Sequence, residues 1–149
     1  MYVAKYGCMG NEKDEPTMHI AIIENDPGLR QILAALLDDE GFTVIEWPSG
    51  AGAHAMIRRE RPDIVLLDLR LEEARAGLAV LEDIRDDPDT RETAVIVCSG
   101  DIRFLHEQGA MLRALRCGII EKPFDIAELL ALIHTATSAP PAIDRAACA

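Results

Sequence analysis

Several short apolar runs of this chain end on polar or charged residues whose types could do chemistry together. Carboxylate and amide oxygens are the ligands that a hard cation such as Mg²⁺ prefers. A lysine ammonium and a serine hydroxyl are suited to holding the oxygens of a phosphoryl group. An aspartate among such groups could carry that phosphoryl group. The residues that end these runs are Glu24, Asn25, Asp26, Asp68, Ser99, Glu121 and Lys122.

The stretch PDIVLLDLR, residues 62–70, indicates which kind of element positions these residues. Its apolar part, Ile64 to Leu67, is too short for an ordinary helix and too continuous for a strand with one face in water. It predicts a strand buried on both faces, as in a parallel sheet. Asp68 then lies at the carboxyl end of the strand, where open α/β sheets bind ligands. A turn or helix-cap role for Asp68 fits this stretch equally well.

Strand and helix patterns alternate along the chain. Asp26, Ser49 and Asp125 are expected to cap the N-termini of helices, and Gly41 is expected to end the first helix. The predicted strands cover 19–23, 43–45, 64–67, 94–98 and 119–120. The first predicted helix runs from Pro27 until Gly41, and the second covers 50–60. The third contains Leu78, Leu81 and Ile84 and ends near Pro88. The fourth covers 102–116, and the last runs from Ile126 through Ile133.

Five repeats of a strand followed by a helix predict a doubly wound α/β fold, a (βα)5 unit whose parallel sheet carries helices on both faces. The flavodoxin-like strand order 2-1-3-4-5 is its natural solution. In this order the first, third, fourth and fifth strands are neighbours, so the polar residues at their ends meet at one edge. Two carboxylates about 4 Å apart repel by about 4 kcal/mol at an effective dielectric constant near 20, and a bound cation relieves this repulsion.

The size and composition of the chain restrict its function. Its 149 residues fit one domain. We expect this domain at 18–138, a mobile N-terminal extension at 1–17 with Met18 as an alternative start, and a short C-terminal tail at 139–149. The net charge of −11 disfavours binding to nucleic acid or to a membrane surface, and no apolar segment has membrane-spanning length. The four cysteines form no C-x-x-C pair, which indicates reduced thiols in a cytoplasmic protein.

The chain contains the fragments IIENDPGLR, PDIVLLDLR, VIVCSG and IIEKPF. In this order and spacing they resemble the receiver domain of two-component response regulators, of the stand-alone, single-domain type. The resemblance runs from about Met18 to Ser138. It implies transfer of a phosphoryl group from a partner's phosphohistidine to Asp68 in the presence of Mg²⁺.

The resemblance also implies roles for the other strand-end residues. Glu24 and Asn25 occupy the acid-pair positions of the metal site, and the backbone carbonyl of Arg70 occupies a third ligand position. Ser99 and Lys122 would bind the phosphoryl oxygens, and the family has a cis peptide at the position of the Lys122-Pro123 bond. The implied partners are a sensor histidine kinase or a histidine phosphotransfer protein, and a downstream protein target. Such a receiver assists its own phosphorylation and dephosphorylation and is not a turnover enzyme, and no output segment is expected after residue 138.

The chain departs from the family pattern at the second acid-pair position, which is usually aspartate and here is Asn25. An amide oxygen still binds Mg²⁺, but one negative charge is lost, so we expect weaker metal binding and slower phosphorylation. Asp26 could substitute as a ligand, although a helix-cap role is the favoured interpretation.

Two further departures concern the switch between states. The loop LRLEEARAG lacks the usual proline and reaches Gly77 one residue late, so its shape should differ. In it, the side chain of Arg70 could reach the phosphoryl group, but a solvated pairing with Glu72 or Glu73 is favoured. Ile119 replaces the usual tyrosine or phenylalanine, whose ring reorients on activation.

Other functions remain as alternatives. A degenerate receiver would bind a partner without phosphorylation, which Asn25 and Ile119 favour and an intact Asp68 opposes. A phosphatase like the haloacid dehalogenases would need a second acid where the chain has Arg70. Dinucleotide binding would need a glycine-rich turn after the first strand. The arginines 103, 113 and 116 could form a docking face, although a solvated face is the favoured interpretation.

Overall fold

The structure, a computed structural model, describes residues 17–73 and 75–138. The expected extension, apart from its last residue, and the expected tail lie outside the described residues. Within the described part of the chain, five parallel strands form one sheet in the order β3-β2-β4-β5-β6, which is 2-1-3-4-5 in chain order and confirms the predicted topology. The strands are β2 (His19–Ile23), β3 (Thr43–Trp47), β4 (Ile64–Asp68), β5 (Ala94–Ser99) and β6 (Gly118–Glu121).

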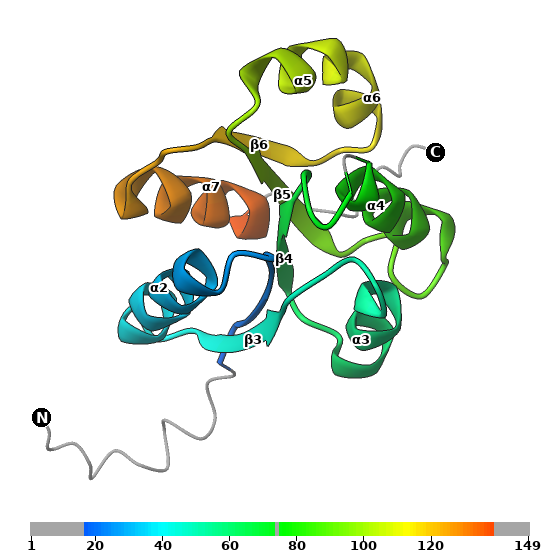
Figure 1. The fold of residues 1–149 in the computed structure, drawn as a ribbon. Helices are drawn as coiled ribbons and strands as arrows, with labels where there is room; N and C mark the ends of the chain where they lie inside the picture. Colours follow the sequence, from blue (N-terminus) through cyan, green and yellow to red (C-terminus); the bar gives the residue numbers. More distant parts are fainter. Residues whose placement is uncertain (1–16, 74, 139–149) are drawn as a thin grey trace, which may run out of the picture.

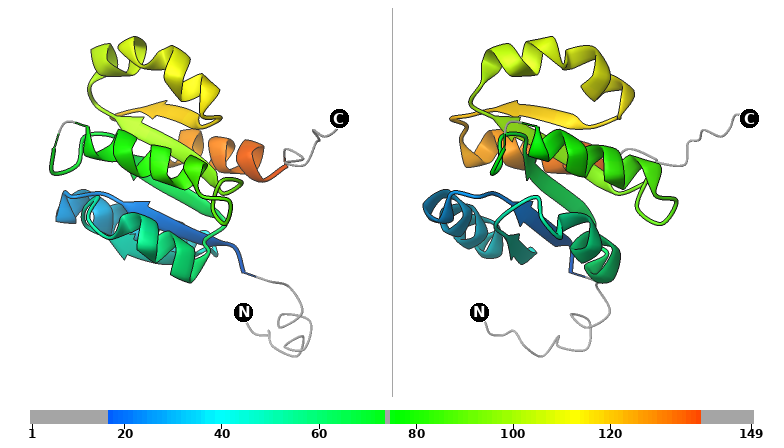
Figure 2. Two further views of the ribbon diagram at one scale, coloured as in Figure 1. Left: turned by 90° about the vertical axis from the view of Figure 1, so that its right-hand side faces the viewer. Right: turned by 45° about the vertical axis from the view of Figure 1, so that its right-hand side comes forward.

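Helices cover both faces of this sheet, as Figure 1 shows. Helices α2 and α7 lie on one face, and α3 and α4 lie on the other; α5 and α6 lie at the β6 end of the sheet, which the views of Figure 2 also show. The helices are α2 (Pro27–Asp39), α3 (Ala53–Glu60), α4 (Ala76–Asp86), α5 (Ile102–Glu107), α6 (Gly109–Ala114) and α7 (Ile126–Ser138). No helix of the described residues is long and apolar enough to cross a membrane.

Strand β4 is buried at every position, which explains its continuous apolar sequence. Because successive side chains of a strand point to opposite faces, Ile64 and Leu66 contribute to the core under α2 and α7. Val65 and Leu67 contribute to the core under α3, α4, α5 and α6. The predicted buried strand is therefore confirmed, and it holds Asp68 at its carboxyl end.

The predicted caps of the first and last helices are confirmed. The Asp26 carboxylate accepts the backbone N–H groups of Gly28 and Leu29 at the start of α2. Gly41, with φ of +100°, follows the end of this helix. At the start of α7 the Asp125 carboxylate accepts the N–H of Glu128, whose carboxylate accepts the N–H of Asp125. This reciprocal pair is a capping box.

The predicted cap at Ser49 is wrong, and α3 begins at Ala53 instead of residue 50. The hydroxyl of Ser49 donates to the carbonyl of Ala51. The indole N–H of Trp47 donates to the same carbonyl, and a Cβ atom on Gly52 would lie 3.0 Å from the indole ring. The loop therefore wraps around the Trp47 side chain, and Gly52, with φ of +75°, closes it before the helix begins.

The predicted single helix over 102–116 is also wrong, because the segment forms two short helices that meet at Gln108. Glycine is a poor helix former because it loses the most backbone entropy, and Gly109 lies at this junction. Leu105 and Leu112 both enter the same core from the two helices. The break lets both short helices bury an apolar residue beside β5 and β6.

Candidate functional site

The strand order brings the predicted site residues together at the carboxyl ends of the central strands. The ammonium nitrogen of Lys122 lies 2.9 Å from Oε1 of Glu24 and 3.2 Å from Oδ2 of Asp68. Both carboxylates are buried, with 2% of Glu24 and 4% of Asp68 exposed. A single lysine, from the segment that follows β6, therefore bridges two acids from β4 and from the end of β2.

Backbone groups orient the two carboxylates. The second oxygen of Glu24 accepts the N–H of Asp26 at 3.1 Å, and Oδ1 of Asp68 accepts the N–H of Arg70 at 3.0 Å. The loops that follow β2 and β4 thus direct both acids toward Lys122. Each of these hydrogen bonds joins residues only two positions apart, so contacts of this kind could be predicted from the sequence.

Glu24, Asp68 and Lys122 form an acid cluster in which negative charge exceeds positive charge. Burial raises the pKa of Asp68, and the negative charge of Glu24 adds to this rise against the opposing effects of the Arg70 N–H and Lys122. Burial acts to lower the pKa of Lys122, but its hydrogen bond to Glu24 and the charge of Asp68 outweigh that effect and raise it. One ammonium shared by two carboxylates leaves an excess negative charge, which favours a bound cation.

The donor set fits Mg²⁺ by its chemistry. Two carboxylates, the amide of the exposed Asn25 and the carbonyl of Arg70 are all hard oxygen donors. Among the described residues, no group of three or more histidine, cysteine, aspartate or glutamate side chains is arranged to hold a metal ion. An amide and a backbone carbonyl would have to complete the set. The carboxylate of Asp26 is engaged in capping α2, which agrees with the favoured cap interpretation.

Ser99 is fully buried at the end of β5, and its hydroxyl oxygen accepts the N–H of Asp101 at 3.0 Å. The Asp101 carboxylate caps α5 by accepting the N–H of Phe104. Its other oxygen pairs with the guanidinium of Arg70, which lies 5.8 Å from the centre of the Phe104 ring. Sequence reasoning missed Asp101 and Phe104, although the SGD segment, residues 99–101, which begins with the last residue of β5, was a signal for a polar contact there.

The favoured pairing of Arg70 with Glu72 or Glu73 is wrong. The Glu72 carboxylate instead accepts the N–H of Gly50, at 2.8 and 3.2 Å, and so ties the loop after β4 to the loop before α3. Arg70 pairs instead with Asp101, which follows the neighbouring strand β5 and caps α5. Proximity in sequence alone therefore gave a wrong partner.

Two further features that the sequence pointed to are Ile119 and the peptide bond after Lys122. Ile119 is partly buried and packs against the core under α4, α5 and α6. It carries no polar group that could move toward the site. The Lys122-Pro123 peptide bond is cis, as the resemblance implied.

Comparisons with known proteins agree with this fold. The family model for the response regulator receiver domain matches residues 20–134 of the chain. The chain therefore belongs to the family of response regulator receiver domains, which are signalling domains of two-component systems.

Individual relatives differ in how much of their length this chain covers. It is 27% identical over 124 residues to sporulation initiation phosphotransferase F of Bacillus subtilis, covering 81% of this chain and 90% of that one. It is 31% identical over 119 residues to the nitrogen assimilation regulatory protein NtrX of Azorhizobium caulinodans, covering 78% of this chain but 25% of that one. The chain spans a quarter or less of the length of the first curated relatives it matches.

A solved structure shares the fold. The receiver domain of a sensor histidine kinase from Pseudomonas aeruginosa PAO1 has a TM-score of 0.73 at 22% identity, covering 83% of this chain and 100% of that one. That structure holds a magnesium ion coordinated in its active-site cleft.

Proposed function

We propose that this domain accepts a phosphoryl group on Asp68 from a phosphohistidine of a partner protein and signals this state to a downstream protein. The donor would be a sensor histidine kinase or a histidine phosphotransfer protein. The observation that carries the proposal is the bridging of two buried carboxylates by Lys122. A carboxylate held in this way is close to both a fixed positive charge and the donor atoms for a cation.

In the proposed transfer, a carboxylate oxygen of Asp68 attacks the phosphorus atom and forms a P–O bond. The P–N bond breaks, and its electron pair returns to the imidazole of the donor. Lys122 turns from Asp68 toward an oxygen of the transferred group and compensates its charge. The hydroxyl of Ser99 accepts the N–H of Asp101, so its own proton is free to be donated to a second phosphoryl oxygen.

Glu24, Asn25, Asp68 and the carbonyl of Arg70 would hold Mg²⁺ in this proposal. The ion would neutralise the charge that builds up between the Asp68 carboxylate and the incoming phosphoryl group. The contribution of this chain is to keep two of the oxygens buried and oriented by backbone N–H groups before the ion arrives. Because these oxygens are already oriented, the protein would need to reorganise less when Mg²⁺ binds.

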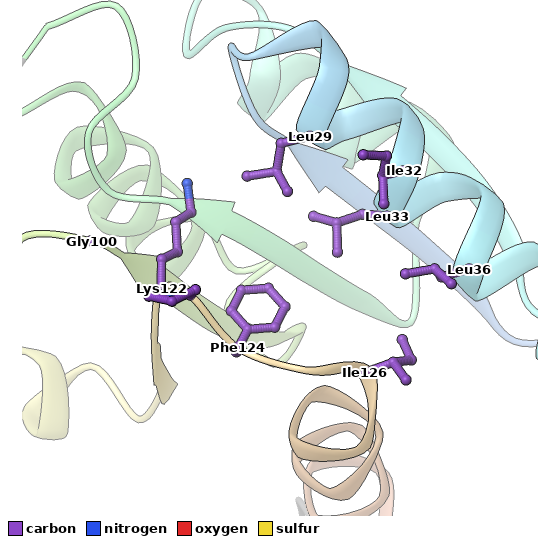
Figure 3. Close-up of a pocket in the computed structure, with 9 residues that line it drawn as sticks. Leu29, Ile32, Leu33, Leu36, Gly100, Lys122, Phe124 and Ile126 are labelled. Carbon is purple, nitrogen blue, oxygen red and sulfur yellow. The ribbon is translucent and has the colours of Figure 1, made fainter.

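An apolar groove beside the site offers a docking face for the phosphohistidine-bearing partner. Figure 3 shows it between α2 and the segment that leads into α7, with Lys122 at one end. Its volume is about 460 Å³. Ile32 and Leu36 on α2 are 59% and 39% exposed. Because Lys122 lines both the groove and the acid cluster, a partner helix in the groove would bring its histidine to Asp68.

A second function is favoured by two residues. Asn25 removes a charge from the metal site, and Ile119 lacks the polar aromatic group of the family switch. A receiver with these features could bind its partner without phosphorylation.

The two functions can be separated by measuring the intact mass of the protein after incubation with a small-molecule phosphodonor, with and without Mg²⁺. We expect the parent to gain one phosphoryl group only when Mg²⁺ is present, and Asp68→Asn to gain none. Lys122→Gln should lower the extent of labelling, because the compensating charge is lost. If the parent gains no phosphoryl group with any donor or metal concentration, phosphorylation is rejected and binding of the unmodified form is retained.

A further inference from the structure

A second cavity lies at the end of the sheet opposite to Asp68. It has a volume of about 570 Å³, within the range of small-molecule sites. It is lined by the first residues of β5 and β6 and by residues near the ends of α4 and α7. Asp68 pairs in register with Cys98, whereas the cavity begins at Thr93 and Ala94, so the two sites lie at opposite ends of β5.

The cavity is positively charged although the chain is acidic. Its lining contains Arg85, Arg91 and Arg116 and a single carboxylate, Glu92, so two positive charges are in excess. The chain as a whole has a net charge of −11. A local excess of the opposite sign attracts anions to this cavity.

Arg85 contributes a largely buried charge that is held by backbone carbonyls. Its guanidinium donates to the carbonyls of Leu115, Thr93 and Arg91, at 2.7, 2.7 and 2.9 Å. These contacts satisfy N–H groups and hold the wall of the cavity, but they do not cancel the unit charge. Within the described residues, no carboxylate forms an ion pair with Arg85. Burial, followed by the charge of Arg116, lowers the pKa of Arg85, and the weaker effects of Cys117 and Glu92 oppose this only in part.

The two other arginines are able to contact a ligand. Arg116 and Arg91 are exposed. The guanidinium of Arg116 lies 3.6 Å from the carboxylate of Glu92 and donates to the backbone carbonyl of Arg91 at 3.3 Å, which engages two of its five N–H groups. In the part of the chain that the structure describes, the side chain of Arg91 forms no ion pair. Both guanidinium groups therefore have N–H donors left for an anion, and such planar donors bind phosphate oxygens in pairs.

The rest of the lining is mostly apolar. Val95, Ile96 and Leu132 line the cavity, and Gly118 lines it without a side chain. An anion held only by the arginines would leave this surface in water. A ligand with an apolar part beside its charged group would cover it, and burial of apolar area contributes about 25 cal/mol per Å².

We propose that this cavity binds a small phosphate monoester, with its phosphate on Arg91 and Arg116 and its apolar part against Val95 and Leu132. A phosphate monoester carries about −1.5 to −2 charges at neutral pH, which matches the two excess positive charges. A carboxylate would compensate only one of them. The proposal is independent of phosphorylation at Asp68.

Phenyl phosphate is the probe for this proposal, because it joins a phosphate monoester to one apolar ring. Titration without Mg²⁺, followed by backbone amide NMR, should give saturable shifts at Thr93, Gly118 and Thr135. Inorganic phosphate should bind more weakly, and phenol should give no saturable shifts. Arg91→Gln and Arg116→Gln should each weaken phenyl phosphate binding about tenfold, since a charge-assisted hydrogen bond is lost.

Arg103→Gln is the matched control, because this arginine is exposed on α5 and pairs with Glu107 outside the cavity. It should leave the dissociation constant unchanged, and thermal unfolding of each variant verifies that it is folded. The proposal is overturned by shifts that do not saturate at about 1 mM, by equal weakening in Arg103→Gln, or by shifts centred on Gly100 and Lys122. The last outcome would mean that the probe binds at the acid cluster instead.

Discussion

The guanidinium of Arg70 is paired with the carboxylate of Asp101, which links the loop after β4 to the start of α5. The same carboxylate caps α5, and the N–H of Asp101 is bound to the hydroxyl of Ser99. A displacement of Ser99 toward a phosphoryl group would therefore stretch its hydrogen bond with the N–H of Asp101 at the start of α5. Under the proposed function, this connection would link phosphorylation of Asp68 to α5 without an aromatic residue at position 119.

The Arg70–Asp101 pair should contribute little to stability by itself. Both side chains are partly exposed, and such ion pairs contribute about 0.2–1 kcal/mol. Asp101→Asn keeps a good cap and should lower the free energy of unfolding by that small amount. Asp101→Ala loses the cap as well, so it should cost about 1 kcal/mol more. Urea unfolding of both variants measures the difference, and equal losses would mean that the cap contributes nothing.

Replacing Asn25 with aspartate should strengthen Mg²⁺ binding by about tenfold or more, because the variant adds a negative charge next to the bound ion. Calorimetric titration of Mg²⁺ into the parent and Asn25→Asp measures the change. Asp26→Asn is the matched control, because its side chain caps α2 and asparagine caps equally well. Identical affinities for parent and Asn25→Asp would show that residue 25 does not contact the ion.

Asp87 should make part of the stability depend on pH. The N–H of Asp89, and then the charge of Arg58, hold the pKa of Asp87 below its ordinary value of 3.8. A carboxyl group with a lowered pKa in the folded state stabilises the fold above its unfolded pKa. This contribution is lost as the pH falls through the folded pKa.

Asp87→Asn removes this charge and keeps an oxygen that can accept the N–H of Asp89. We therefore expect the parent to be more stable than Asp87→Asn at pH 6, and the difference to shrink toward zero as the pH falls below about 3.8. Thermal unfolding across this range measures it. A difference that is constant with pH would contradict the assigned role of the charge.

Local patterns in the sequence predicted the elements that depend on neighbouring residues. The buried strand before Asp68 and the caps at Asp26 and Asp125 follow from apolar runs and from contacts within three residues. The failed predictions depend on contacts between distant segments. The loop before α3 is shaped by the ring of Trp47, and Arg70 pairs with a residue 31 positions later. The acid cluster could be predicted because the strand order, once correct, brings its members together.

Two helical glycines should respond to alanine in opposite directions, because they differ in what surrounds the missing Cβ atom. At Gly77 that atom would lie 2.4 Å from Cα of Leu69 and 2.5 Å from the carbonyl oxygen of Asp68. These are backbone atoms at the end of β4 and cannot move aside without displacing the Asp68 carboxylate. At Gly109 the nearest atom is a guanidinium nitrogen of Arg113 at 3.4 Å, which is an ordinary contact with a flexible side chain.

Gly77→Ala should therefore lower the free energy of unfolding by about 1–3 kcal/mol, the usual cost of overpacking, and should reduce phosphoryl labelling of Asp68. Gly109→Ala should raise the free energy of unfolding by about 0.5–1 kcal/mol, since alanine is the better helix former, and leave labelling unchanged. Guanidinium unfolding and intact mass measure both effects. If Gly77→Ala were as stable as the parent, the loop after Asp68 would not have to return so close to β4, and its departure from the family pattern would have no bearing on the site.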